Sequence, residues 1–365
     1  MSLPKYSRRI LSALFFTFII YMIISVLLQP QAACKGVING LLICYNKLIP
    51  SLFPFLILSS LLMSHPYAKY LGFMFYPYLK LMRIHNKKSA VCILLGTIGG
   101  FAVGASMITS LFEQGDVNKR EAELLLCCVV GTGPAFVIGV VGFGLFGNVE
   151  LGIILFLSLV TASLVSGIIC NVFYHNNAKN IVLSASALQH NNKDFSITSI
   201  ITKSTVTMLS LCGFIVSFSC FLSLVCSADA SPIVRYIICA FTEVTQGCIA
   251  AMNCSQNKIY LICASLSLIG LCAFMQIRSI CSKELSLLPL LLSRIIHLPI
   301  SLMLLTISIK LINPKINTAL TETVNRAYFR LPADTMLFLF LFSLVVIYDL
   351  DLSCKKHLHK PCKNV

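Results

Sequence analysis

Long apolar runs separated by short polar turns dominate this chain. The runs cover residues 10–28, 36–63, 70–82, 89–112, 122–146, 151–173, 204–228, 235–252, 259–280, 285–312 and 335–348. Helices of about 20 apolar residues cross the hydrocarbon core of a bilayer, where every backbone amide and carbonyl must find its partner within the protein. The pattern predicts an all-α, polytopic helical membrane protein with about eight crossings.

Several runs contain residues that break helices. Pro50 and Pro54 interrupt one run, four glycines lie within 89–112, and Gly-Thr-Gly-Pro at 131–134 interrupts another. Proline removes a backbone donor and clashes with the preceding turn, and clustered glycines suit close helix contact or re-entrant segments. We expect broken or re-entrant helices here. The sequence leaves open whether 89–112 and 259–280 span the bilayer or re-enter.

A polar stretch rich in Asn, Ser and His, residues 174–203, separates two hydrophobic halves of similar layout. Paired broken helices in corresponding positions are typical of transporters built from inverted repeats. We therefore expect two related halves. The predicted segments are an N-terminal transmembrane helix (1–34), a first repeat (35–173), a polar cytoplasmic linker (174–203), a second repeat (204–312), a polar loop with the last transmembrane helix (313–350) and a basic cytoplasmic tail (351–365).

The composition agrees with a lipid-facing surface. The chain is 57% hydrophobic and 11% charged, with a mean hydropathy of +0.88, whereas soluble domains carry about 25% charged residues. The formal net charge is +15, but the cations flank apolar runs. That arrangement follows the positive-inside rule and does not indicate a nucleic-acid partner. It predicts a protein integral to the membrane, with both termini in the cytoplasm.

Two features that resemble processing or cross-linking signals have simpler interpretations. Gln-Ala-Ala-Cys at 31–34 resembles a lipoprotein cleavage site, but the apolar run before it is longer than a usual signal-peptide core, which favours an uncleaved helix. Most of the 17 cysteines lie within apolar runs, where free cysteine behaves as a small hydrophobe. We predict no disulfide framework.

Ionisable groups within the runs each cost about 2.5–3.5 kcal/mol on insertion scales and therefore require a reason. Glu243 is followed by Thr245, Gln246 and Gly247. It is interpreted either as a coupling carboxylate or substrate ligand beside an unwound turn, or as a hydrogen-bonded carboxylate that fixes helix packing.

Two further pairs of residues each contain an arginine. Gln276 and Arg278 close the segment that starts at Gly270, and a guanidinium can pair bidentately with a carboxylate. The alternative is a cation that snorkels to the interface. Arg294 and His297 are three residues apart and share a helix face, so they either line a cavity that attracts an anion or serve packing.

No catalytic or metal-binding signature stands out. The chain lacks His-Glu-x-x-His, Gly-x-x-x-x-Gly-Lys-Ser/Thr and Gly-x-Ser-x-Gly. The tail contains Cys354, His357, His359 and Cys362, which are zinc-ligand types, but their spacing favours a solvated basic tail. We expect neither an enzyme, nor a cofactor, nor a bound metal.

Around the interruptions the chain resembles the YlbJ-type family of sporulation integral membrane proteins, which carry the nucleoside-recognition "Gate" domain. The matching stretches are 49–55, 99–105, 133–139, 242–247 and 270–277, in the family's order. The resemblance implies two Gate-like repeats and a permease of spore-forming bacteria, located in the mother-cell-derived membrane around the forespore. It also implies export of dipicolinic acid from the mother cell.

The sequence thus predicts a transporter for a small anionic or heteroaromatic solute, working by alternating access around a site between the halves. A nucleoside-type transporter and a non-transporting sporulation scaffold are the alternatives, and a homo-oligomer is left open. The residues predicted to line the site are Glu243, Thr245, Gln246, Gln276, Arg278, Arg294, His297, Gly99, Gly100, Gly104 and Pro134.

Overall fold

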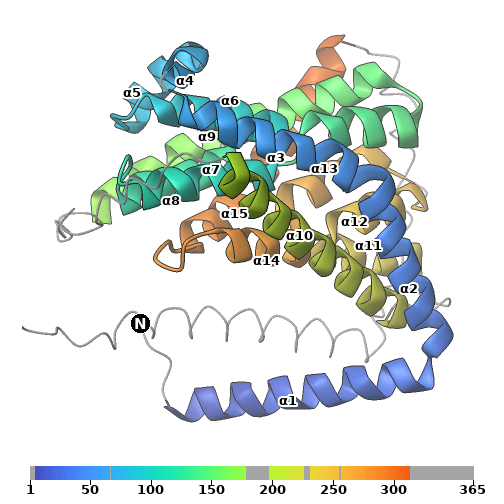
Figure 1. The fold of residues 1–365 in the computed structure, drawn as a ribbon. Helices are drawn as coiled ribbons and strands as arrows, with labels where there is room; N and C mark the ends of the chain where they lie inside the picture. Colours follow the sequence, from blue (N-terminus) through green and yellow to red (C-terminus); the bar gives the residue numbers. More distant parts are fainter. Residues whose placement is uncertain (1–4, 66, 178–196, 226–230, 255, 313–365) are drawn as a thin grey trace, which may run out of the picture.

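The computed structural model describes residues 5–65, 67–177, 197–225, 231–254 and 256–312, and all regular elements within these ranges are helical (Figure 1). This confirms the predicted all-helical class. The predicted last crossing at 335–348 and the tail cysteines and histidines lie outside the described residues. The cysteines within the described ranges are free.

The N-terminal part is a long helix followed by a sharp turn. Helix α1 spans Lys5–Leu28, and α2 (Pro30–Ile43) begins with a proline in its first turn, where the missing N–H costs nothing. The two helices meet at an angle of 100°. A π-helical segment, η1 (Cys44–Leu48), joins α2 to α3 (Ile49–Ser64).

The interruption expected in the run 36–63 is this π-helical segment. It ends two residues before Pro50, whose ring nitrogen cannot donate a hydrogen bond to the preceding turn, and Pro54 follows inside α3. A π-bulge is one of the ways in which a helix accommodates such a break. Three short helices complete this part: α4 (Ala68–Leu71), η2 (Phe73–Phe75) and α5 (Tyr76–Met82).

The run 89–112 folds back on itself as a helical hairpin. Helices α6 (Lys88–Gly99) and α7 (Phe101–Glu113) pack side by side and are joined by Gly100 alone. Gly100 has φ 80° and ψ −174°, a conformation essentially restricted to glycine. The chain therefore reverses its direction at Gly100.

A second hairpin of the same design occurs in the other half. Helices α11 (Pro232–Thr242) and α12 (Val244–Met252) pack against each other and are joined by Glu243 in an extended conformation. A Cβ on Gly247 would lie 2.8 Å from the Cα of Ala240, so only glycine permits this approach between the two arms.

Each hairpin is followed by a broken helix. In the first half α8 (Lys119–Val129) ends before residues 130–134, and the chain resumes as the π-helix η3 (Ala135–Leu145). In the second half α13 (Lys258–Leu268) and α14 (Gly270–Ile280) are separated at Ile269, which has a positive φ of 70°. Together α13 and α14 form a single candidate span without a sharp bend.

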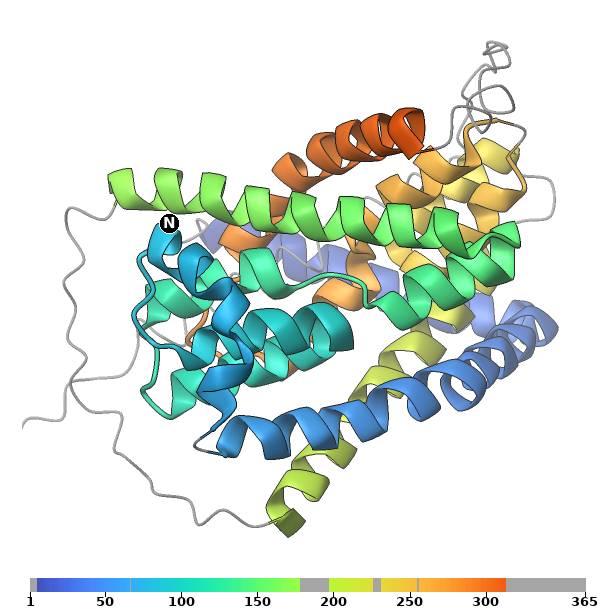
Figure 2. The ribbon, with the colours of Figure 1, turned by 90° about the horizontal axis from the view of Figure 1, so that it is seen from above.

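Three long helices frame these elements. They are α9 (Val149–Asn177), α10 (Ile197–Val225) and α15 (Leu288–Ile312). Helix α10 packs against α2 and α3, and α15 packs along α9 (Figure 2). Each pair joins one helix from either side of the linker, so the two halves of the chain share their packing surfaces.

The described helices are suited to a bilayer. Four are long and apolar enough to cross, namely Val149–Phe173, Ile197–Val225, Lys258–Ile280 and Leu288–Ile312, and a fifth span results if the bent pair α1–α2 is counted as one. Large apolar side chains lie exposed on α1, α2, α10 and α15. The class of polytopic membrane protein follows. The total of eight crossings stays a prediction.

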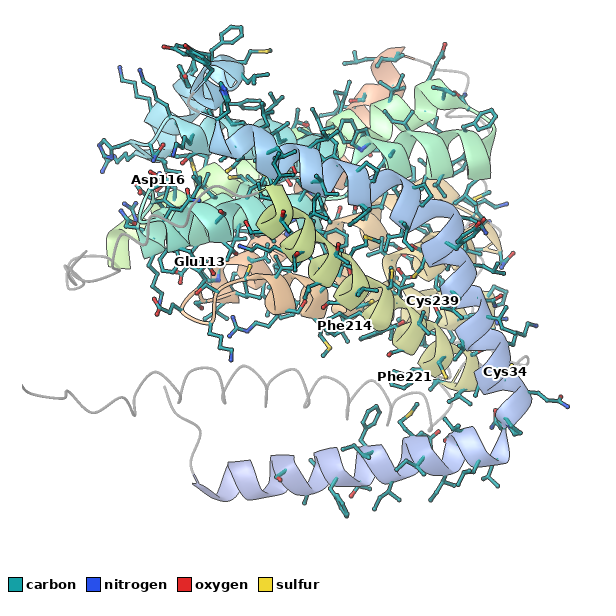
Figure 3. The ribbon with its side chains drawn as sticks, in the orientation of Figure 1. Cys34, Glu113, Asp116, Phe214, Phe221 and Cys239 are labelled. Atoms are coloured by element: carbon teal, nitrogen blue, oxygen red, sulfur yellow. The ribbon has the colours of Figure 1, made fainter. Side chains whose placement is uncertain are left out.

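One end of the molecule concentrates positive charge. Here Lys88 Nζ donates to Asp116 Oδ2 at 2.7 Å, closing the base of the first hairpin, and Lys203 Nζ lies 3.6 Å from Glu113 Oε2. Figure 3 places Glu113 and Asp116 at this end and Cys34 toward the other. We call it the basic end. Its cations are Lys80, Arg83, Lys87, Lys88, Lys119, Arg120, Lys203, Arg278 and Lys283.

The two hairpins enter from opposite ends. The base of the α6–α7 hairpin lies at the basic end. Helix α14 finishes at the basic end beside Arg278, so the start of α13, at the other end of the same span, lies opposite. The α11–α12 hairpin closes next to that start, where Cys254 Sγ contacts the Pro232 carbonyl oxygen at 3.7 Å.

A candidate solute site at the hairpin tips and broken helices

In each half the hairpin tip contacts the break of the helix that follows it. A Cβ built on Gly100 would lie 3.2 Å from the amide nitrogen of Gly133, in the α8–η3 break. A Cβ on Gly270, in the α13–α14 break, would lie 3.4 Å from the Thr242 carbonyl oxygen and 3.5 Å from the Glu243 nitrogen. The same tip-to-break contact thus occurs twice and exposes backbone polar groups in the interior.

Each hairpin also reaches the other half. Helix α7 of the first hairpin packs against α14, and α12 of the second hairpin contacts η3. Helix α14 is part of the broken helix of the second half, and η3 is part of the broken helix of the first half. Each hairpin therefore contacts the broken helix of the other half. The two hairpins and the two broken helices are therefore packed together across the halves, and we call this region the centre.

Glu243 is the acidic group of this centre and is only 6% exposed. Its carboxylate accepts hydrogen bonds from the amides of Thr245 at 3.0 Å and Gln246 at 2.7 Å, so it caps α12. A carboxylate is favourable at a helix N-terminus, where unpaired amides and the helix dipole are positive. The structure thus brings Glu243, Thr245 and Gln246 together and gives the carboxylate backbone partners.

Gln276 and Arg278 lie on α14, beyond the break. Gln276 is buried and its Nε2 contacts Cys272 Sγ at 3.3 Å. Arg278 Nη1 donates to the carbonyl oxygens of Ser282 and Leu285, at 3.4 and 3.3 Å, and so ties down the turn before α15. In this structure the guanidinium binds backbone at the basic end.

Arg294 and His297 lie on α15 and are 4% and 2% exposed. Arg294 donates from Nη2 to the Cys127 carbonyl oxygen at 2.7 Å and from Nη1 to the Val130 carbonyl oxygen at 3.2 Å. His297 Nε2 lies 3.1 Å from the Leu159 carbonyl oxygen on α9. The structure therefore places both residues at the α8–η3 break, as expected of one helix face.

The remaining predicted residues mark the backbone of the same region. Gly99 ends α6 and packs against the Phe55 ring of α3, and Gly104 lies on α7 against Val129. Pro134 precedes the first turn of η3, where an N–H group would have no partner within the helix, so the missing N–H of proline costs no hydrogen bond. A cavity of about 20 Å³ lies between these breaks and is lined in part by Gly131, Arg294 and His297.

Two features were not predicted from the sequence. The first is Glu123 on α8, which is 1% exposed, accepts the Ser286 amide at 2.8 Å and lies 3.9 Å from Lys119 Nζ. It lies in an apolar run next to the polar turn 113–121, so the sequence offered no reason to separate it from that turn. It joins α8 to the turn that Arg278 also holds.

The second is a cavity of about 680 Å³ between α7, α10 and α14. This volume lies within the range of small-molecule sites. Thr109 in its wall is 3% exposed, and its hydroxyl has no hydrogen-bond partner among the described residues. The lining residues are Ser106, Thr109, Thr198, Ser199, Thr202, Lys203, Val206, Thr207, Ser210, Ser279 and Ile280. Hydroxyls spread over three helices carry no sequence spacing that identifies them.

The described residues contain no group of three or more His, Cys, Asp or Glu placed to hold a metal ion. The five stretches that carry the family resemblance all fall at structural interruptions. They lie after η1, at the two hairpin tips and at the two helix breaks.

Comparison with known proteins gives one partial relative. The chain is similar to the sporulation integral membrane protein YlbJ of Bacillus subtilis (strain 168), with 31% identity over 156 residues. The aligned region covers 42% of this chain and 37% of the relative. No family model and no solved structure matches. The similarity to an integral membrane protein and the apolar helices agree in placing this chain in a membrane.

Proposed function

We propose that this protein is a permease that moves a small solute across a bacterial membrane during sporulation. The observation that carries the proposal is the repeated contact between a hairpin tip and a broken helix, at Gly100–Gly133 and at Glu243–Gly270. Discontinuous helices that meet near the middle of two repeats are how many secondary transporters build their sites. The sporulation setting is supported by the partial similarity to YlbJ.

The mechanism that fits this arrangement is alternating access. The hairpins enter from opposite ends, and each one contacts the half-helix of the other repeat, α7 on α14 and α12 on η3. Displacement of one hairpin would open the centre to one side while the other hairpin keeps it closed. The cavity of about 680 Å³ borders α7 and contains Lys203 of the basic end. It is the natural entrance on that side.

Dipicolinate is the first solute to test, because the family resemblance implies it. An anion of this kind can be held by backbone amides at the N-terminus of a half-helix. The start of α12 is already occupied by the Glu243 carboxylate. The starts of η3 and α14, after Pro134 and at Gly270, are therefore the proposed anion contacts.

A neutral nucleoside-like solute is the second candidate, and a specific observation favours it. Arg278 and Arg294 both donate to main-chain carbonyl oxygens. The polar side chains that remain beside the second tip, Glu243 and Gln246, suit hydroxyl and amide groups better than a dicarboxylate.

The test is uptake of radiolabelled dipicolinate, and separately of nucleosides, into proteoliposomes that contain the whole chain. We expect saturable uptake that falls at least about tenfold in Glu243→Gln, which corresponds to about 1.4 kcal/mol. Glu150→Gln is the matched control, because Glu150 is an exposed acid at the start of α9. Absence of uptake for all of these solutes, in protein that is monodisperse and thermally cooperative, would favour the scaffold hypothesis.

A further inference from the structure

Arg294 is a buried cation whose partners are oxygens of the main chain. The guanidinium binds the Cys127 and Val130 carbonyl oxygens, at the C-terminal end of α8, and also contacts the neighbouring Ser293 hydroxyl at 3.2 Å. The last carbonyls of a helix have no amide partner within the helix and carry its negative dipole end. Arg294 therefore neutralises a helix end that would otherwise be left open at the break.

No carboxylate lies within ion-pair distance of Arg294 among the described residues. The hydrogen bonds that Arg294 donates all go to carbonyl and hydroxyl oxygens, and the thiols of Cys127, Cys128 and Cys170 also lie near its guanidinium. Such a set of oxygens is what a hard monovalent cation requires, and half-helix ends with unwound carbonyls are where transporters coordinate Na⁺ or H⁺. The oxygens that Arg294 binds are thus of the kind that coordinate an alkali ion.

The adjoining cavity of about 20 Å³ provides a second, independent observation. Thr132 and Ser163 contribute polar groups to its wall, and His297 lines it with an Nδ1 that has no partner among the described residues. An unpartnered nitrogen this deeply buried indicates a small polar occupant such as water. The region around Arg294 is accordingly a built polar site.

The second break differs in this respect. There α15 presents Ser301, seven residues after Arg294 and two turns along the same face, and its Oγ lies 2.7 Å from Ser267 Oγ on α13. One helix therefore supplies a guanidinium to the first break and a hydroxyl to the second. The two halves have the same order of hairpin and broken helix, but α15 presents a charged side chain only to the first break.

We propose that the guanidinium of Arg294 takes the place of a coupling ion. It binds the carbonyl oxygens at the end of α8, where a transporter with broken helices would otherwise bind such an ion. The site is therefore complete without Na⁺. Shortening the side chain would create a pocket for a guanidinium or another monovalent cation. The inference for coupling rests on the proposed permease function: solute movement needs no Na⁺ at the first break.

The test uses the whole chain in detergent and follows thermal unfolding with a thiol-reactive fluorogenic dye, because the many buried cysteines become accessible only on unfolding. We expect Arg294→Ala to lower Tm. We expect ethylguanidinium, at a concentration on the order of 10 mM, to restore at least half of the loss, since a ligand of the native state raises Tm. Arg278→Ala, which removes a guanidinium from an accessible turn, is the matched control and should not respond.

The proposal is overturned if ethylguanidinium shifts Arg294→Ala no more than Arg278→Ala. It is also tested by Arg294→Lys and Arg294→Met, which differ in charge at similar length. The lysine variant should give the higher yield of monodisperse protein, and equal yields would contradict a role for the charge. None of these measurements depends on transport, so failure of the uptake experiment and failure of this proposal are separate results.

Discussion

At the scale of single residues, buried charge in this protein is balanced by the backbone. Glu243 accepts two amides at the start of α12, and Arg294 donates to two carbonyls at the end of α8. Both side chains lie where a helix is interrupted and unpaired main-chain groups are available. The interruption and the charge therefore stabilise each other, and neither requires an oppositely charged side chain.

Replacement of Glu243 by alanine should destabilise the second hairpin. Both amides of the cap lose their acceptor, which typically costs about 0.5–2 kcal/mol at a helix N-terminus. Glu243→Gln keeps one oxygen acceptor and should cost less. Thermal unfolding of the two variants measures the difference. An alanine variant as stable as wild type would show that the cap contributes nothing.

Glu123→Ala should destabilise the protein by about 1–3 kcal/mol, because the Ser286 amide then loses its acceptor in a buried position. Lys119→Ala is the control. Lys119 is exposed, so loss of its ion pair with Glu123 should cost less than about 1 kcal/mol. If the two changes lowered the stability equally in thermal unfolding, the contribution of Glu123 would come from its ion pair with Lys119 and not from its hydrogen bond with the Ser286 amide.

At the scale of elements, the hairpin turns depend on conformations that few residues adopt. The first turn needs a glycine at position 100, whereas the second uses Glu243 in an ordinary extended conformation. The second turn thus leaves its joining residue free to carry a functional side chain. This difference places the acidic group of the centre on one hairpin only.

Gly100→Ala should strain the first hairpin by about 1–3 kcal/mol, the usual cost of a side chain in this region of φ and ψ. Gly213→Ala is the control: Gly213 lies inside α10 with open space around it, so alanine should be neutral or stabilising there by up to about 1 kcal/mol. Thermal unfolding of both variants measures the difference in stability. A Gly100→Ala protein as stable as Gly213→Ala would contradict the turn conformation.

At the scale of the whole molecule, the distribution of cations sets the orientation. The positive-inside rule predicts that the basic end faces the cytoplasm. On this prediction the first hairpin would enter from the cytoplasm and the second from the opposite side, and the linker 174–203 would be cytoplasmic. The sequence also predicts a crossing at 335–348, outside the described residues, and both termini in the cytoplasm.

Reporter fusions test this orientation. A fluorescent protein inserted in the linker near residue 190 should fluoresce, and alkaline phosphatase inserted there should be inactive, because the phosphatase matures only outside the cytoplasm. Fusions in the turn between α12 and α13, near Asn257, should give the opposite pair of results. The reverse pattern at both positions would show that the basic end faces outward.

The amino-acid sequence by itself determined the class of the protein and the positions of its interruptions. Long apolar runs require helices in lipid, and Pro50, the glycines around Gly100 and Gly131 to Pro134 mark the places where a helix cannot continue. These are local properties of the backbone, so they can be read along the chain. The same reasoning identified Glu243 and Arg294 as groups that need partners.

Only the tertiary structure decided what each interruption becomes and which groups it brings together. Residues 89–112 return as a hairpin, whereas 258–280 continue as one span, although both contain glycine at the break. The choice depends on which surfaces pack against the two arms. The partner of Arg294 lies about 165 residues away in the chain, at the end of α8. Contacts between distant segments follow from packing between helices, and no spacing along the sequence encodes them.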